Sequence, residues 1–323
     1  MTHYLIRRIV LLIPMLFGIS LLTFGVLHLA PGKPTDLVTD LNTKMTLEAK
    51  QKLIELYGLN KPWHIQYWNW VKRIAKLDFG RSFKDDRLVL AKIGERLPAT
   101  LLLNFLSLSL IFILALYIGV IAAAKKNSLF DRATTLFVYI GFSVPTFWIA
   151  LLLMILLGLK LGILPISGLR SLNYDEFTIF GKALDLLKHL ILPVTVMALT
   201  GLASLTRYSR SSMLEVLNQD YIRAARAKGL SENVVLWKHA FRNALIPVIT
   251  ILGLMLPELI GGSFIFETIF AYPGMGRLGF EAILSRDYPV LMGIGTVAAF
   301  LTLLGNLVAD LLYAFADPRI RYR

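Results

Sequence analysis

Long apolar stretches alternate with shorter polar segments along this chain of 323 residues. An α-helix needs about 20 mainly apolar residues to cross a membrane, and six stretches meet or approach that length. The fourth is the shortest, and the fifth is interrupted by Pro257, Glu258 and a pair of glycines. The pattern predicts an all-α integral membrane protein with six transmembrane helices. The predicted spans cover residues 9–30, 98–124, 133–159, 189–206, 246–270 and 289–315.

The first stretch is expected to be a membrane span that stays in the protein, not a removable signal peptide. Its apolar run is longer than the roughly 7–15 residues of a signal sequence, and no clear cleavage site follows it. Arg7 and Arg8 precede it, and Lys and Arg also concentrate at 125–132, 207–243 and 319–323. Because Lys and Arg favour the cytoplasmic side, we expect both termini to lie inside (N-in, C-in).

The polar segment 31–97 is predicted to be a helical insert on the outer side of the membrane. Thr46 is placed to start a helix over about 47–57, and Pro62 precedes a second helix with apolar residues at helical spacing. This apolar face suits the membrane–water interface, where Trp and Tyr concentrate. Burial within the insert is the alternative. The face consists of Trp63, Tyr67, Trp70, Val71 and Ile74.

The chain is accordingly divided into three parts. Residues 1–30 form an N-terminal segment with the first span, residues 31–97 form the insert, and residues 98–323 form a transmembrane core. Within the core, 160–188 is expected to be an outer loop with a short helix near 181–188. The polar segment 207–245 is the longest predicted inner loop.

Composition and charge favour a membrane protein and argue against a soluble domain or a nucleic-acid-binding protein. Hydrophobic residues make up 56% of the chain and the mean hydropathy is +0.65, whereas soluble domains are about 45–50% apolar. Basic flanks of the spans account for much of the net charge of +13, and they are expected to attract anionic lipid. No pattern of interleaved aromatic and basic residues indicates nucleic-acid binding.

Motifs for common catalytic and metal sites are missing from the sequence. It contains no G-x-x-x-x-G-K-[ST], H-E-x-x-H or G-x-S-x-G, so we expect no ATP-binding loop of this kind and no catalytic residues. The absence of cysteine excludes disulfides and thiolate metal ligands. The five histidines are scattered along the chain, so no metal site is predicted.

Polar residues within the spans are candidates for a transport path, because ionisable groups at membrane depth usually face protein or water. Glu258 lies next to Pro257 and just before Gly261-Gly262, and a helix broken at this depth is typical of a transport path. A purely structural Glu, paired with a neighbouring helix, is the alternative. Asn104 is expected to form an interhelical hydrogen bond. The candidate path residues are Glu258, Gly261, Gly262 and Asn306.

The segment 207–243 carries seven Lys and Arg between two apolar spans. Asp220 can start a short helix, because acidic residues are favoured at the positive end of a helix. Gly229 can end that helix in a left-handed cap. In between, two alanines allow another surface to approach, and two arginines share a basic flank. The alternative is a solvated basic loop. The residues concerned are Asp220, Arg223, Ala224, Ala225, Arg226 and Gly229.

Several pieces of sequence carry a family resemblance over nearly the whole length. They are Tyr4–Arg8, Tyr57-Gly58-Leu59 with Pro62, Gly80-Arg81-Ser82, Glu95–Thr100, DYIRAARAKGLSE at 220–232, FRNALIPV at 241–248, FETIFAYPGMGRL at 266–278 and ADPRIRY at 316–322. With these pieces the chain resembles the permease subunit of bacterial dipeptide/oligopeptide ABC importers, a group that includes nickel and glutathione importers. Arg223 stands where the broader superfamily has Glu, and Pro247 comes later than in that pattern. The role of that Glu is therefore not carried over to Arg223.

The resemblance implies a type I ABC importer permease fold in the bacterial cytoplasmic (inner) membrane. It implies three kinds of partner: a homologous second permease, two ABC ATPase subunits and an extracytoplasmic substrate-binding protein. The helix at 220–229 would dock on an ATPase, and ATP and Mg would bind only in the ATPase subunits. This chain would bind no cofactor and catalyse no reaction, and peptide would cross between the permeases unchanged.

Other functions stay open at this point. A nickel or glutathione importer permease is the alternative within the same group. An ion-coupled secondary transporter and a non-transporting membrane scaffold are alternatives from other classes.

Overall fold

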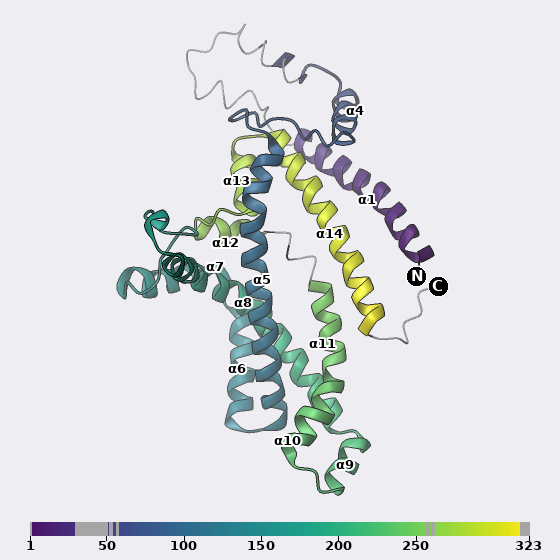
Figure 1. The fold of residues 1–323 in the computed structure, drawn as a ribbon, viewed down its shortest axis with the longest axis vertical. Helices are drawn as coiled ribbons and strands as arrows, with labels where there is room; N and C mark the ends of the chain where they lie inside the picture. Colours follow the sequence, from purple (N-terminus) through teal and green to yellow (C-terminus); the bar gives the residue numbers. More distant parts are fainter. Residues whose placement is uncertain are drawn as a thin grey trace.

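The computed structural model describes residues 2–29, 51, 54–55, 58–255, 259 and 262–316, which fold as helices joined by loops (Figure 1). The long helices are α1 (Thr2–Leu29), α5 (Val89–Ala124), α8 (Ile179–Leu217) and α14 (Tyr288–Ala316). The shorter ones are α4 (Trp63–Ile74), α6 (Leu129–Ser143), α7 (Thr146–Leu153), α9 (Asp220–Ala227), α10 (Glu232–Val234), α11 (Phe241–Met255), α12 (Phe264–Ile269) and α13 (Met275–Leu284). π-Helical turns extend α7 over Met154–Lys160 and precede α11 over Val235–Ala240, and a 3-10 turn covers Tyr174–Glu176.

Membrane-length helices dominate the described part of the chain. Five helical segments are long and apolar enough to cross a membrane, and a sixth is obtained if α6 and the segment after it count as one bent span. The predicted helical membrane fold is therefore confirmed. α5 begins at Val89, nine residues before the second predicted span and inside the predicted insert, and the third, fourth and fifth predicted spans also differ from the structure, each for a local reason. The five segments are Val10–Leu29, Val89–Ala124, Ile179–Leu217, Glu232–Met255 and Tyr288–Val308.

The predicted third span, 133–159, is broken in the middle. α6 and the segment Thr146–Lys160 meet at 100°. Val144 is extended, with φ −95° and ψ 126°, because a residue before proline avoids the helical region. Pro145 has no N–H to continue the helical hydrogen bonds. The prediction of one continuous helix here is wrong.

The fourth span belongs to a helix much longer than the predicted 189–206. α8 runs from Ile179 to Leu217, so it includes both the short outer helix expected near 181–188 and the start of the polar segment. Thr178 caps its first turn, accepting the N–H of Gly181 at 3.2 Å. Residues 207–217 contain neither proline nor glycine, so the helix continues beyond its apolar part.

The predicted fifth span, 246–270, is not one continuous helix, because the extended Ser263 lies before a separate helix, α12, that begins at Phe264. The expected break in this span is thus present. Asn104 on α5 donates from Nδ2 to the carbonyl oxygen of Leu259 at 2.8 Å, and so binds the segment that follows α11. Pro257, Glu258 and Gly261 lie outside the described residues.

α5 and α8 form the central pair of the molecule, with α6, α7 and α11 packed against α8 (Figure 1). Small residues allow the two backbones to approach closely, as in many membrane helix pairs. A Cβ added to Gly119 on α5 would lie 2.6 Å from Ser209 Oγ and 2.9 Å from the backbone nitrogen of Arg210. Glycine at this position therefore sets the spacing between the two helices.

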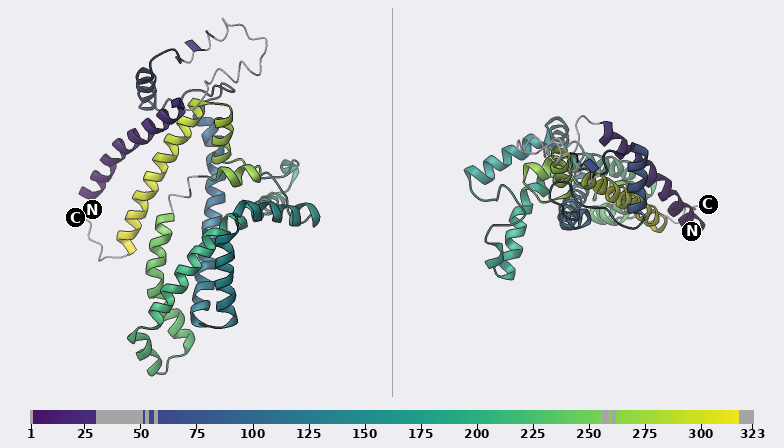
Figure 2. Two further views of the ribbon diagram at one scale, coloured as in Figure 1. Left: turned by 180° about the vertical axis from the view of Figure 1, so that it is seen from behind. Right: turned by 90° about the horizontal axis from the view of Figure 1, so that it is seen from above.

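The insert helix α4 packs on α1 and α14, which lie side by side (Figures 1 and 2). Pro62 precedes α4, as predicted. Tyr67 is buried in a cluster with Phe24 and Met292, and its hydroxyl is 2.9 Å from Ser20 Oγ. Tyr67, Trp70 and Val71 of the apolar face therefore pack on the spans, whereas Trp63 at the start of the face is 54% exposed. Most of the first predicted insert helix, 47–57, lies outside the described residues.

A buried polar network fixes the rest of the insert to the turn before α14. Ser82 Oγ donates to Asp287 Oδ2 at 2.5 Å, and the Phe83 N–H donates to Oδ1 at 3.0 Å. Lys92 Nζ donates to Ser82 Oγ at 3.0 Å and to Asp85 Oδ2 at 2.8 Å. Burial alone would raise the pKa of Asp85, but the hydrogen bond from the positively charged Lys92 is a main cause that lowers it to about 2. Gly80-Arg81-Ser82, part of the family resemblance, therefore has a structural role.

Candidate functional site

The short helix α9 lies at the end of the molecule opposite the insert (Figures 1 and 2). It begins at Asp220, after the extended Gln219, whose carbonyl accepts the N–H groups of Ile222 and Arg223 at 3.1 and 3.3 Å. It ends before Gly229, which has φ +78° and donates its N–H to the Arg226 carbonyl at 2.9 Å. The predicted helix and its left-handed glycine are both confirmed.

One face of α9 is buried in the chain itself. Ile222 is fully buried and Ala225 is 8% exposed. They pack on the ends of α5 and α8 and on the segment leading into α11. The expectation that both alanines receive another surface is therefore wrong for Ala225, whereas Ala224 is exposed. The other buried members of this apolar cluster, which we call the α9 socket, are Val120, Ala123, Met213, Val235, Ala240 and Ala244.

The charged residues of α9 lie on its exposed side and are paired within the loop. Arg223 contacts Asp220, with Nη1 and Oδ1 3.4 Å apart. Arg226 donates to both carboxylate oxygens of Glu232, at 2.9 and 3.2 Å. The basic flank expected from the two arginines is thus balanced by two acids. Exposed ion pairs of this kind contribute at most about 1 kcal/mol, so they can exchange partners readily.

Further hydrogen bonds tie this region to the adjoining long helices. Asn243 at the start of α11 donates from Nδ2 to Tyr221 Oη at 2.9 Å. Ser212 on α8 donates to the carbonyl of Ala244 at 3.0 Å. These residues were not predicted, although Tyr221 and Asn243 lie in the two sequence pieces DYIRAARAKGLSE and FRNALIPV. Their hydrogen bond joins these pieces in space.

The candidate path residues are only partly described. Gly262 has φ +51°, and a Cβ there would lie 2.9 Å from the backbone nitrogen of Gly276, so it lies where the chain passes close to α13. Asn306 is exposed on α14. Glu258 and Gly261 lie outside the described residues, and the path assignment stays a prediction.

Sequence reasoning missed Glu267, the first acidic residue of α12. It is fully buried, and it accepts hydrogen bonds from Thr100 Oγ1 at 3.0 Å and from the Arg277 N–H at 2.8 Å. A Cβ on Gly274 would overlap its carboxyl group. The glycines of Pro-Gly-x-Gly in FETIFAYPGMGRL were a usable signal, since glycine is favoured where another group closely approaches the backbone.

No group of three or more His, Asp or Glu side chains is placed to hold a metal ion within the part of the chain that the structure describes. What the geometry does provide is a short, exposed helix seated in a socket made by three membrane-length segments. Together with the membrane-length helices, this arrangement defines a multi-pass membrane protein with a short helix exposed at one end.

The chain matches the family described as binding-protein-dependent transport system inner membrane component over residues 115–322. Residues 1–104 match the N-terminal part described for such membrane components. The chain therefore belongs to this family of ABC importer permease subunits, and it is a multi-pass protein of the inner membrane. The resemblance stated from the sequence is confirmed.

Several curated proteins are similar over their whole length. The oligopeptide transport system permease protein AppB of Bacillus subtilis is 46% identical over 323 residues, with 100% of both chains covered. The dipeptide transport system permease proteins DppB of Alkalihalophilus pseudofirmus and Escherichia coli are 40% and 36% identical, again with both chains fully covered.

A solved structure shares the fold. A chain of the MetNI methionine ABC transporter, in an inward-facing conformation, superposes with a TM-score of 0.57 at 17% identity. The match covers 71% of this chain and 97% of that chain. The fold is thus that of an ABC importer permease.

Proposed function

We propose that this permease carries di- or oligopeptides across the inner membrane as half of the transport path of an ATP-driven importer. The observation that carries the proposal is full-length identity of 36–46% to permeases named for dipeptide or oligopeptide transport. This favours peptides over nickel or glutathione. The peptide leaves the complex chemically unchanged.

The partners that we propose follow from the family. A second, homologous permease completes the path, two ABC ATPase subunits hold ATP and Mg, and an extracytoplasmic binding protein delivers the peptide. This chain supplies no cofactor site and no catalytic residue. Its contribution is mechanical, and it begins at α9.

Docking of α9 on an ATPase explains why the helix is built as it is. Ala224, Arg223 and Gly229 are exposed, whereas Ile222 fills the α9 socket. A partner that moves α9 therefore pushes on α5, α8 and α11 together, because the socket contains residues of all three segments. Motion of these helices would open the path alternately to the two sides of the membrane.

We place the path beside the break after α11. Glu258, Gly261, Gly262 and Asn306 are the proposed path residues, and Asn104 on α5 donates to the carbonyl oxygen of Leu259, which places α5 next to this part of the chain. Replacing Glu258 with Gln tests its part in this proposal. We expect near-wild-type stability and a changed preference among acidic, neutral and basic dipeptides; unchanged uptake of all three would make Glu258 a structural residue.

The proposed orientation places α9 and both termini in the cytoplasm and the insert outside. The position of α9 and the insert at opposite ends of the molecule supports it (Figure 1). Because the chain has no cysteine, single cysteines can report the sides. Asn60→Cys should react with an impermeant thiol reagent in intact cells, and Ser231→Cys only after permeabilisation. The reverse pattern would refute the orientation.

Reconstitution of the whole complex in lipid nanodiscs or vesicles tests the function. ATP hydrolysis should rise when peptide-loaded binding protein is added, and vesicles should accumulate peptide only with ATP. An ion-coupled transporter predicts uptake without ATP that collapses with the ion gradient. A scaffold predicts no flux under either condition.

A further inference from the structure

A carboxylate at the start of α6 binds an arginine from α8 close to the α9 socket. Arg210 donates from Nε to Asp131 Oδ1 at 2.5 Å and from Nη2 to Oδ2 at 2.9 Å. Asp131 is only 3% exposed. A two-point, charge-assisted contact of this kind fixes the relative position of its partners more strictly than a single hydrogen bond.

Asp131 is also fixed from its own side of the chain. Its Oδ2 accepts the N–H of Asn127 at 2.9 Å, and its own N–H donates to Ser128 Oγ at 3.3 Å. The first of these bonds holds the turn between α5 and α6, and the second caps α6. One carboxylate therefore joins this turn, α6 and α8.

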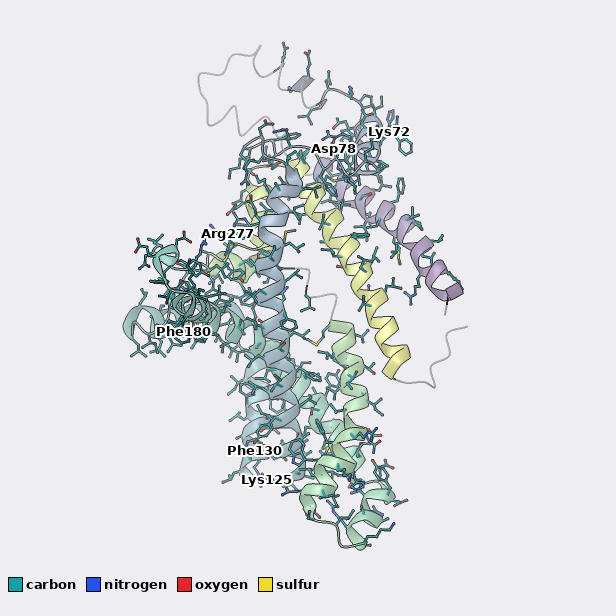
Figure 3. All side chains as sticks on the ribbon, in the orientation of Figure 1. Lys72, Asp78, Lys125, Phe130, Phe180 and Arg277 are labelled. Carbon is teal, nitrogen blue, oxygen red and sulfur yellow. The ribbon has the colours of Figure 1, made fainter. Side chains whose placement is uncertain are left out.

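The part of α8 that carries Arg210 contacts several other helices at the same level. Ser209 and the backbone of Arg210 face Gly119 on α5, Ser212 binds the Ala244 carbonyl of α11, and Met213 is in the α9 socket. Lys125 and Phe130, which flank the turn held by Asp131, lie at the end of the molecule where α9 is found (Figure 3).

We propose that Arg210 and Asp131 are positioning residues that make α6 move together with α8 when α9 is displaced. The proposal rests on the proposed function of α9 as the ATPase contact. Separating the pair would leave the buried Asp131 carboxylate without its opposite charge, which is unfavourable. The pair therefore stays closed while the helices move, and α5, α6, α8 and α11 act as one block at this end.

The first test measures coupling in the reconstituted complex. Asp131→Asn should keep assembly and basal ATP hydrolysis, but stimulation by loaded binding protein should fall about fivefold or more, the lower end of typical coupling between sites. Arg210→Lys keeps the charge without the two-pronged geometry and should give an intermediate value. Glu215→Gln, which removes an exposed carboxylate from α8, and Arg132→Gln are the matched controls and should match wild type.

A double variant separates positioning from stability. Asp131→Asn with Arg210→Gln leaves no unpaired charge, so the complex should assemble at least as well as with Asp131→Asn alone, while stimulation stays low. Recovery of full stimulation in the double variant would show a purely structural role and overturn the proposal. Normal stimulation with Asp131→Asn alone would overturn it as well.

A distance measurement tests the proposal without relying on α9. Spin labels at Tyr139→Cys on α6 and Tyr208→Cys on α8, both more than half exposed, report the separation of the two helices. It should be the same in the nucleotide-free and ATP-bound complex, and should shift or broaden with ATP once Asp131→Asn is added. A change in this separation on ATP binding without Asp131→Asn would overturn the proposal that α6 and α8 move together. If Gly229→Val leaves stimulation unchanged while the distances behave as expected, the docking function fails and the α6–α8 link stands.

Discussion

The two ends of this permease are held by opposite kinds of interaction. At the insert, buried polar groups form directional hydrogen bonds from Ser82 and Phe83 to Asp287. At α9, the contact with the rest of the chain is mainly apolar, through Ile222 and Ala225. A satisfied buried polar network specifies one geometry, whereas apolar contact is non-directional. The insert end is thus suited to keep one arrangement and the α9 end to transmit displacement.

The largest expected effect comes from removing the acceptor at the insert end. Asp287→Leu leaves the Ser82 hydroxyl and the Phe83 N–H without their acceptor. We expect a loss of about 3–5 kcal/mol in the stability of this region. Limited proteolysis of residues 58–88 and thermal inactivation measure it. Asp86→Asn, in an exposed ion pair with Arg81, is the control; equal effects of both would contradict the role of the network.

At the α9 end, the matching change is Ile222→Ala. It empties part of the α9 socket and should cost about 2–4 kcal/mol in the attachment of α9. Protease cleavage around 218–231 should increase, and stimulation of the ATPase should fall although the protein still inserts. Leu230→Ala, in the same loop but 40% exposed, should change little. Wild-type coupling with Ile222→Ala would mean that the socket does not transmit force.

Gly229→Val should have a smaller effect, confined to the backbone. No atom lies within 4 Å of a Cβ built there, so no clash arises, and the cost is the left-handed strain of about 1–2 kcal/mol. The readout is the stimulation of the ATPase in the assembled complex. Gly229→Asn should cost less than valine because Asn tolerates this region. Equal loss with both residues would indicate that the partner contact, and not the strain, is responsible.

The smallest effect is a pH dependence at the insert end. The pKa of Asp85 in the folded protein is about 2, below its ordinary value near 3.8, so its contribution to stability is complete above that ordinary value. It is lost as pH falls from about 4 towards 2. Protease resistance of the insert should be flat from pH 8 to 5 and decline below 4. Asp85→Asn should flatten that decline; an unchanged profile would assign it to other carboxylates.

The sequence was sufficient where a local rule decides the structure. Pro62 before α4, the acidic start of α9 and the left-handed Gly229 all follow from the preferences of single residues. The apolar runs located the membrane helices because a spanning segment has to be apolar over its whole length.

The sequence was insufficient where a boundary depends on context. The apolar run 189–206 predicts a membrane span within α8, but nothing in that run indicates that the helix extends at both ends, from 179 to 217. The third span breaks at Pro145, yet α5 and α8 continue through Pro98 and Pro193. A proline in the sequence therefore does not by itself predict where a helix breaks. Ala224 and Ala225 are adjacent residues of the same type. Ala225 is the buried one because it lies on the same face of α9 as Ile222, which packs in the α9 socket.

The length of α8 has a geometric consequence. With a rise of 1.5 Å per residue, its 39 residues span about 58 Å, roughly twice the hydrocarbon thickness of a bilayer. At the tip far from α9, Asp185 accepts both the N–H and the hydroxyl of Ser171. A displacement of this tip of α8 would therefore carry the loop that contains Ser171 with it.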